Sequence, residues 1–387
     1  MKYALLRPLI CLALAALAPE TAAGAGEAAC VALPAHATRI KRHGHNTWSG
    51  ETLIVARAIA SGVAAPPGWI PVGADRIEAG CAWFPPRQAT LFVNPAFWRV
   101  ETIRGEAAGL DLQLLTLKST PPEELDGWRR MVAETYADVA TLFPLGLPAD
   151  QSLPHVILVT SGIAGDGARR SSRLFPAPGP NLTSLFYPPG SGRGRDLFIH
   201  TTTHLFNKRR PRPEAVPEED GLRSSEYREL VATWAEIAFN RDDAHVRKRV
   251  GSLRRAHVAL TDDDGDTWPN ARSIAATRSA EGPFGLPPHA PEGSKAAREY
   301  AHYYLGPLIM LALDGLLAEK GTAVSVRMLL RDIHAGNSPG LLASLRRVLP
   351  ERFGQIRSWM DGTEAIPAGL VERGLARLQD RVVEIAQ

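Results

Sequence analysis

The sequence predicts an α+β protein in which a small β-rich region is followed by a mostly α-helical part. Short apolar runs broken by Gly and Pro fill the chain up to about residue 119. Beyond that point, apolar residues recur with helical spacing. A chain of 387 residues with 45% hydrophobic content can bury a large core and form two domains.

The expected elements follow from these patterns in chain order. Apolar runs bounded by turn residues predict strands over residues 52–56, 89–93, 110–117 and 155–160. Helical spacing predicts a helix over residues 123–142 after two prolines, and an amphipathic C-terminal helix over 371–386 that packs on the other helices. Between them, residues 162–196 are rich in Gly, Pro and Ser and predict loops, with Asp196 capping the next helix.

That next helix carries the pattern with the clearest chemistry. His200 and His204 are four residues apart, so they project from one face of a helix, and Glu236 follows 32 positions after His204. Two histidines on one helix and a carboxylate from another can form a three-ligand zinc site. The helix is bounded by apolar residues, so an imidazole or carboxylate there needs a partner. The residues alone leave two hypotheses open: a shared metal ion, or mutual hydrogen bonding.

The residues after the second histidine resemble those of the glycyl aminopeptidase family of gluzincin zinc metallopeptidases, in which an HExxHxWN helix runs into a basic segment. The matching residues are Asn207, Arg209, Arg210, Arg212 and Pro213. The resemblance implies a thermolysin-like fold over about residues 120–345, with one zinc ion held by His200, His204 and Glu236. It also implies that residues 184–187 form a strand at the sheet edge that holds substrate. After Glu236 the chain has Ile237-Ala238-Phe239, where the family has Gly-Phe-Thr.

A second segment, residues 303–314, resembles the YxKG-initiated helix of gluzincins. The resemblance implies that Tyr303 donates a hydrogen bond to an oxyanion in the active site, a form of transition-state stabilisation. A tyrosine packed at the start of a surface helix is the alternative. Leu305 stands where the family has lysine. Next along the chain, Ser325 is expected to cap a helix that Gly336 closes.

The largest departure from the family concerns Thr201. The family has glutamate at this position, and that glutamate takes a proton from the metal-bound water. A threonine hydroxyl is no base near neutral pH, so peptidase activity is expected to be absent or atypical.

Three hypotheses remain for function. The first is an exported, metallopeptidase-like protein with a zinc site, and the second is a non-catalytic module that binds a peptide or protein while retaining the fold. The third is an active hydrolase with a relocated base, supplied by Glu226, Glu229 or the acidic residues 218–220.

The N-terminus has the features of a secretory signal. A basic start and a short apolar run precede small residues, which predicts a signal peptide over residues 1–25 with cleavage somewhere between 23 and 26. The remaining chain divides into an expected β-rich domain over 26–119 and a gluzincin-like domain over 120–387. The protein is therefore expected to be periplasmic or secreted. The apolar run is shorter than the roughly 20 residues of a spanning helix, so no membrane span is expected after cleavage.

The cysteine content predicts a disulfide, and the net charge bears on the class of binding partner. After removal of Cys11 with the signal, Cys30 and Cys81 are the remaining pair, and an oxidising compartment favours a disulfide between them over two free thiols. The net charge of +3 is spread along the chain rather than gathered in a basic patch. This pattern argues against a nucleic-acid-binding protein.

Overall fold

The computed structural model describes the chain in twelve stretches that hold every element discussed below. They are residues 30–33, 38–41, 51–56, 62–84, 90–105, 110–146, 155–159, 182–185, 187–207, 224–261, 304–360 and 364–385. The predicted signal peptide over 1–25 lies outside these residues.

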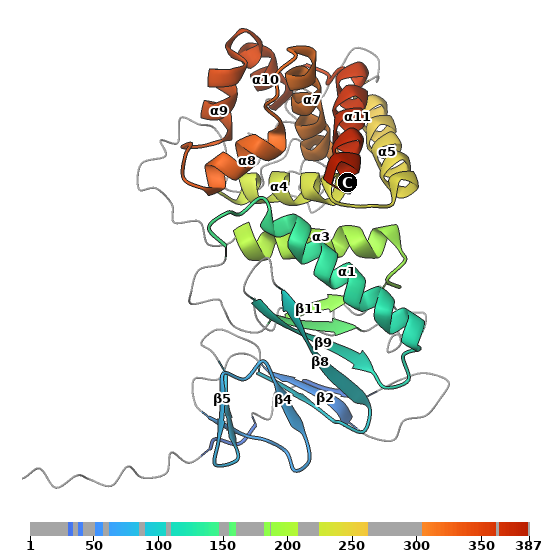
Figure 1. The fold of residues 1–387 in the computed structure, drawn as a ribbon, viewed down its shortest axis with the longest axis vertical. Helices are drawn as coiled ribbons and strands as arrows, with labels where there is room; N and C mark the ends of the chain where they lie inside the picture. The colour runs from blue at the N-terminus through green and yellow to red at the C-terminus, as the bar shows by residue number, and fades with distance from the viewer. Residues whose placement is uncertain are drawn as a thin grey trace, which may run out of the picture.

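Three β-sheets occupy the N-terminal end of the molecule (Figure 1). An antiparallel sheet has the order β1-β2-β7-β4, formed by Thr38–Lys41, Glu51–Ala56, Thr90–Val93 and Ile70–Val72. A smaller antiparallel sheet has the order β3-β6-β5, formed by Val63–Ala64, Cys81–Trp83 and Arg76–Glu78. A mixed sheet has the order β11-β10-β9-β8, formed by Leu182–Leu185, His155–Val159, Leu110–Leu117 and Trp98–Gly105.

The mixed sheet joins the β-rich region to the helices because its two faces pack into different cores. Leu112 and Leu114 of β9 lie in the large core that the helices share. Leu115 and Leu117 of the same strand pack with residues of the first sheet. Successive side chains of a strand point to opposite faces, so one apolar strand can serve both cores. The leucines of this strand thus face two cores, which marks a strand with apolar side chains buried on both sides.

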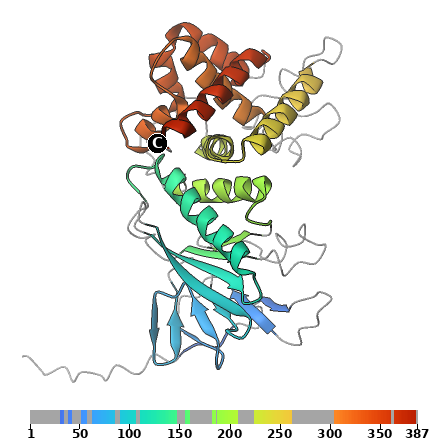
Figure 2. The ribbon, with the colours of Figure 1, turned by 45° about the vertical axis from the view of Figure 1, so that its right-hand side comes forward.

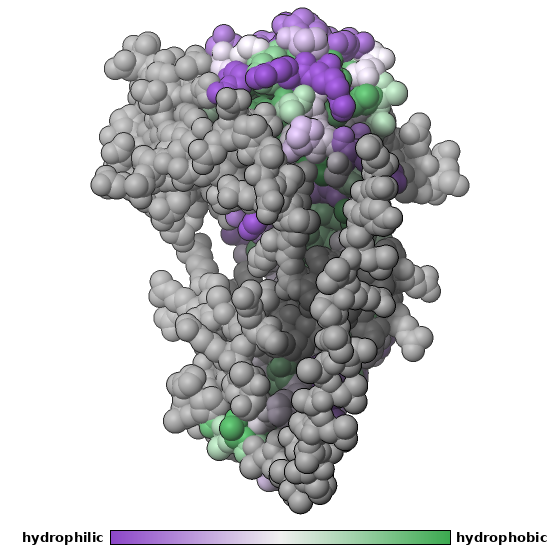
Figure 3. Space-filling model, turned by 90° about the vertical axis from the view of Figure 1, so that its left-hand side faces the viewer, coloured by the Kyte–Doolittle hydropathy of each residue, from purple (hydrophilic) through white to green (hydrophobic). Residues whose placement is uncertain are grey.

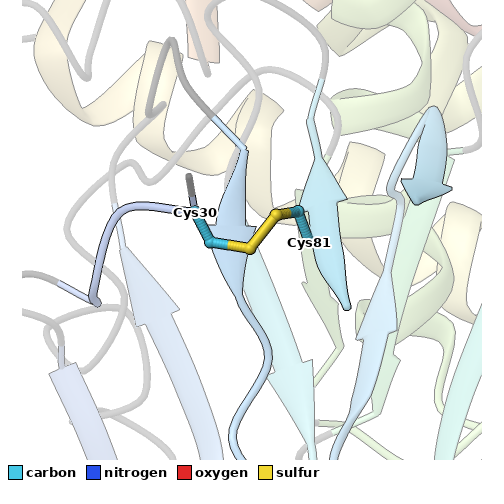
Figure 4. Close-up of a disulfide and its surroundings, with 2 residues drawn as sticks. All are labelled: Cys30 and Cys81. Carbon is cyan, nitrogen blue, oxygen red and sulfur yellow. A yellow bond between two sulfur atoms is a disulfide. The ribbon is translucent and has the colours of Figure 1, made fainter. Parts of the chain in front are cut away.

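A disulfide fastens the start of the described chain to the small sheet. Cys30 is bonded to Cys81 in β6, with a Cα–Cα distance of 5.5 Å (Figure 4). The adjacent Val31 adds a backbone hydrogen bond from its amide to the carbonyl of Gly62, at 2.9 Å. The prediction of this disulfide is confirmed. Because the two cysteines are 51 residues apart in the sequence, their cross-link restricts the unfolded chain and so favours the folded state.

Helices form the remaining layers, as Figures 1 and 2 show. Helix α1 and helix α3 lie over the mixed sheet, α4 packs on α3, and the C-terminal helices form the far end of the molecule. The bounds are α1 Pro122–Ala140, α3 Gly192–Asn207, α4 Ser224–Ala238, α5 Asp243–Thr261, α7 Gly306–Glu319, α8 Val326–His334, α9 Leu341–Val348, α10 Phe353–Met360 and α11 Ala368–Ile385, with a 3₁₀ turn at Pro350–Arg352.

Helix α7 is the centre of the C-terminal helices. All residues from Gly306 to Leu317 are buried, so this helix is surrounded by protein. Two glycines bring the backbones of α7 and α11 together: a Cβ on Gly315 would lie 2.1 Å from the carbonyl oxygen of Leu370, and one on Gly374 would lie 1.9 Å from that of Leu311. No larger residue fits at either position without separating the helices.

The prediction of an α+β fold with small N-terminal sheets and a mostly helical C-terminal part is confirmed. Ser325 caps α8 as expected, because its hydroxyl accepts a hydrogen bond from the amide of Met328, and Gly336 follows the helix with a φ of 81°. The expected division at residue 119 falls between β9 and α1, and the mixed sheet has strands from both sides of it. The division into two domains therefore stays a prediction.

One further finding concerns helices that could span a membrane. Among the described residues, no helix is both long and apolar enough to cross a bilayer. On the face shown in Figure 3, hydrophilic residues predominate over the helical end of the molecule.

Candidate metal centre

Helix α3 begins earlier than its sequence suggests. Residues 190–195 were expected to form a loop that Asp196 ends as a helix cap, but the helix starts at Gly192 and Asp196 lies in its second turn. The cap is Ser191, whose hydroxyl accepts a hydrogen bond from the amide of Gly194 at 3.3 Å. The prediction of a loop here was wrong because these glycines serve close packing. A Cβ on Gly192 would lie 2.4 Å from the His245 ring, and one on Gly194 would lie 2.7 Å from Cβ of Tyr187.

The middle of α3 carries the histidines. His200 is buried and His204 is partly buried. Between them, Thr201 donates its hydroxyl to the carbonyl oxygens of Leu197 and Phe198, at 3.0 and 3.1 Å. This bonding to the preceding turn explains how a threonine is accommodated in a helix interior. It also means that the hydroxyl of Thr201 is directed to its own helix backbone.

Helix α4 supplies two carboxylates to α3. Glu229 and Glu236 are seven residues apart, which is close to two helical turns, so both project from the same side of α4. The imidazole of His200 lies between them: its Nε2 is 3.5 Å from Oε2 of Glu229, and its Nδ1 is 2.5 Å from Oε1 of Glu236. Each carboxylate therefore meets a different nitrogen of the same ring.

The side chains of His200, His204 and Glu229 converge on the side of the His200 ring that carries Nε2. Nε2 of His200 and Nε2 of His204 are 2.9 Å apart, and Oε1 of Glu229 lies 3.3 Å from Nε2 of His204. Within the described residues, these three form a group of potential ligands whose donor atoms all lie within 4.8 Å of one another. Sequence analysis expected Glu236 as the third ligand. The structure brings Glu229 to the two Nε2 atoms, and Glu236 to the opposite side of the His200 ring.

The hydrogen bond with Glu236 determines which nitrogen of His200 acts as the donor. A second interaction joins Glu236 to the guanidinium of Arg249, so its carboxylate is paired with a permanent positive charge. An ionised carboxylate only accepts hydrogen bonds, so Nδ1 of His200 carries the proton that it donates to Glu236. In the neutral imidazole, Nε2 then presents its lone pair toward His204 and Glu229.

Arg249 joins two buried carboxylates. Besides Glu236, it contacts Oδ2 of Asp196 at 2.8 Å. Asp196 also accepts a hydrogen bond from Nδ2 of Asn240 at 2.6 Å and lies 2.7 Å from Nε2 of His245. Burial opposes the charged form of Arg249 and is the largest influence on it, but the charges of Glu236 and Asp196 together raise the pKa of its guanidinium.

The group on the Nε2 side fits a zinc ion by its donor chemistry. Zinc binds imidazole nitrogen and carboxylate oxygen at about 2.0–2.2 Å in tetrahedral sites, which places neighbouring ligand atoms about 3.3–3.6 Å apart. The Nε2 atoms of His204 and His200 lie 3.3 and 3.5 Å from the two oxygens of Glu229, within this range, and 2.9 Å from each other, somewhat below it. A carboxylate on the far nitrogen of a ligand histidine is also common at zinc sites. The same three groups can instead bond to one another, with His204 donating to His200.

Not all predicted site residues can be placed. Tyr303 lies outside the described residues, as do residues 218–220, and the side chain of Glu226 is not among those described. Two residues that sequence analysis did not assign to the site, Asp196 and Arg249, contribute to it. Their buried charges are the signal of this role, because a charged side chain flanked by apolar helix positions requires a partner.

Comparison with solved structures gives remote likenesses to zinc metallopeptidases. The chain is similar to an aminopeptidase N family protein from Idiomarina loihiensis, with 12% identity and a TM-score of 0.47, over 72% of this chain and 50% of the other. It is also similar to an M1 zinc metallopeptidase from Deinococcus radiodurans, with 14% identity and a TM-score of 0.44, over 78% of this chain and 63% of the other.

These likenesses do not assign the chain to a family. The chain spans about half to two thirds of the length of the structures it resembles, and all the TM-scores are below 0.5. No family model matches the sequence, and no curated protein matches it. The assignment of the metal group therefore rests on the contacts described above.

Replacing Arg249 with alanine tests the charge network. Arg249→Ala leaves Glu236 and Asp196 without their shared cation, and we expect it to lower the free energy of unfolding by about 2–3 kcal/mol. This is below the value for fully buried pairs because Arg249 is 18% exposed. Denaturant unfolding measures the loss. The matched control is Arg247→Ala on the same helix, where the side chain is 61% exposed, with an expected change within about 0.5 kcal/mol. Equal losses in both variants would contradict the network.

Proposed function

We propose that this protein is an exported, metallopeptidase-like protein that binds one zinc ion through His200, His204 and Glu229 and has Thr201 in place of the general-base glutamate, so that peptidase activity is absent or atypical. The observation that carries this proposal is the convergence of two Nε2 atoms and one carboxylate from two helices, with separations of 2.9–3.5 Å. The composition of this group is typical of catalytic zinc sites, which have three protein ligands and an open position.

In this proposal Glu236 is a positioning residue rather than a ligand. It accepts the Nδ1 proton of His200 and so directs the Nε2 lone pair to the metal. Arg249 in turn holds the carboxylate of Glu236 in place. This assignment replaces the expectation from sequence spacing, in which Glu236 was the third ligand.

The absence of a base at position 201 limits the chemistry. A bound zinc ion would polarise the carbonyl of a peptide. The neighbouring residue Thr201 has its hydroxyl bonded to helix carbonyls, and an aliphatic hydroxyl is not a base that takes a proton from water. Glu229, which sequence analysis offered as a relocated base, is a ligand in this proposal and is not available for that role.

The finer family assignment also belongs to the proposal. The likeness to the glycyl aminopeptidases rests on sequence segments that lie partly outside the described residues, including the basic segment after Asn207. The same holds for Tyr303 as an oxyanion donor. The described Tyr304 is 39% exposed just before α7, so the chain enters this helix from the surface. A peptide or a protein segment is the ligand class that such a site suits.

A comparison of two glutamine variants tests the ligand assignment. Glu229→Gln removes a charged ligand, and we expect it to abolish tight zinc binding. Glu236→Gln removes only the partner of His200, and we expect it to weaken zinc binding by about 10- to 100-fold. Zinc affinity is measured by competition with a chelator, with circular dichroism as the control for folding. The reverse order, with binding kept in Glu229→Gln and lost in Glu236→Gln, would restore Glu236 as the ligand.

Supplying the missing base tests whether the rest of the site is intact. We expect Thr201→Glu to gain zinc-dependent hydrolysis of aminoacyl and peptide substrates, because positioned proton transfer contributes ~10²- to 10⁴-fold. Thr201→Gln is the matched control, since it has the same size and no basic group. A folded, zinc-loaded Thr201→Glu variant without activity would show that more than the base is missing.

A non-catalytic binding module is the second candidate function. It is favoured by one observation: His200, His204 and Glu229 lie within hydrogen-bonding or ion-pair range of one another, so they can interact directly without an ion. For such a module, His200→Ala leaves partner binding nearly unchanged, whereas a metal-dependent ligand loses affinity.

Export is supported by the disulfide between Cys30 and Cys81, because disulfides persist in oxidising compartments. We expect protein recovered from a secretion-competent host to begin between residues 23 and 27 and to contain no reactive thiol. Mass spectrometry of the intact chain, with and without reductant and alkylation, measures both. A chain that keeps residues 1–25, or that has two free thiols, would contradict export through this signal.

A further inference from the structure

A cavity between α3 and α5 lies beside the proposed metal group and is lined in part by His200 and Glu236. Its volume is about 550 Å³, within the range of pockets that hold small molecules. Buried Asp196 and Glu236 line its inner part, together with Arg249 and one side of His200. Its outer part is lined by exposed Arg193 and Lys248.

The acidic groups of the cavity are already neutralised. Asp196 is paired with Arg249 and lies against His245 and Asn240. Glu236 is paired with Arg249 and receives a hydrogen bond from His200. Because both carboxylates are already paired, we do not expect the cavity to bind a cationic ligand.

The two outer cations leave the cavity lining with more basic than acidic side chains. Arg193 and Lys248 form no ion pair with any residue in the described part of the chain. Arg193 has its guanidinium 5.4 Å from the ring centroid of Tyr187, an arrangement that orients the side chain at the opening. The cavity lining thus has three permanent or near-permanent cations, Arg193, Lys248 and Arg249, against two carboxylates.

We propose that this cavity binds the oxyanion group of a small ligand, a carboxylate or a phosphate, between Arg193 and Lys248. Arginine provides a planar fork of donors and lysine a mobile point charge, and both suit oxyanions. Buried Asp196 and partly buried Arg249 line the inner end of the cavity, and their ion pair joins α5 to α3. Leu197 contributes apolar surface to the lining. We therefore expect the ligand to have an uncharged part that packs against Leu197 beside the oxyanion.

The proposal is independent of zinc binding, since neither Arg193 nor Lys248 belongs to the metal group. A zinc ion can itself bind phosphate or carboxylate, so the experiment includes His204→Ala, which removes a proposed ligand that does not line the cavity. If His204→Ala still binds the oxyanion, the oxyanion site is distinct from the metal site. Loss of binding there would place the oxyanion at the metal and overturn the proposal for the cavity, while leaving the metal proposal standing.

The test is isothermal titration of the purified protein with inorganic phosphate and, separately, with succinate, at low ionic strength. We expect saturable binding of at least one probe at one site per chain, weakened about tenfold or more by Arg193→Ala and by Lys248→Ala. Lys248→Glu should abolish it. Added NaCl should weaken it, because the outer cations are exposed to solvent.

Arg247→Ala is the matched control, with the same loss of charge on the same helix at a residue that does not line the cavity. It should leave affinity unchanged. A preference for phosphate over succinate, or the reverse, identifies which oxyanion the cavity suits. The proposal is overturned if neither probe binds saturably, or if Arg247→Ala weakens binding as much as Lys248→Ala does.

Discussion

The pairing of Arg249 with two buried carboxylates, Glu236 from α4 and Asp196 from α3, is the interaction on which the site depends. One cation from α5 thereby holds three helices together at the level of His200. A buried carboxylate is costly unless a partner compensates its charge, so each of the three side chains requires the others. This requirement fixes Glu236 against Nδ1 of His200, and the orientation of that ring fixes where its Nε2 points.

The fold explains why such a polar arrangement is tolerated in the interior. The mixed sheet is covered by apolar side chains on both faces, and the core on its helical side continues through α3 and α4 to the buried helix α7. The polar groups occupy the contact between these helices, where they pair with one another. The neighbouring cavity between α3 and α5 extends this polar region to the surface. The proposed metal site and the proposed oxyanion site are therefore adjacent and both include His200, but Arg193 and Lys248 belong only to the second.

Much of the fold follows from local sequence patterns, while the site depends on contacts that those patterns do not encode. The strand over residues 110–117, the capped helix after Ser325 and the Cys30–Cys81 disulfide were all predicted, because burial, capping and pairing leave clear signals in the sequence. The start of α3 was missed because Gly192 and Gly194, which look like loop residues, allow His245 and Tyr187 to approach the helix. Glu229 and Glu236 are two turns apart on one face of α4, so spacing alone does not show which of them reaches the Nε2 atoms. Only the packing of α4 on α3 determines that Glu229, and not Glu236, lies beside the Nε2 atoms.

The central claim is that a metal lies between His200, His204 and Glu229, with Glu236 outside its coordination. The most direct test is an anomalous difference map at the zinc edge, from crystals of the full chain grown with zinc. We predict one strong peak within about 2.0–2.2 Å of both Nε2 atoms and of an oxygen of Glu229, with Glu236 still on Nδ1 of His200. A map without a peak at this group, or with a peak bound to Glu236, would contradict the account.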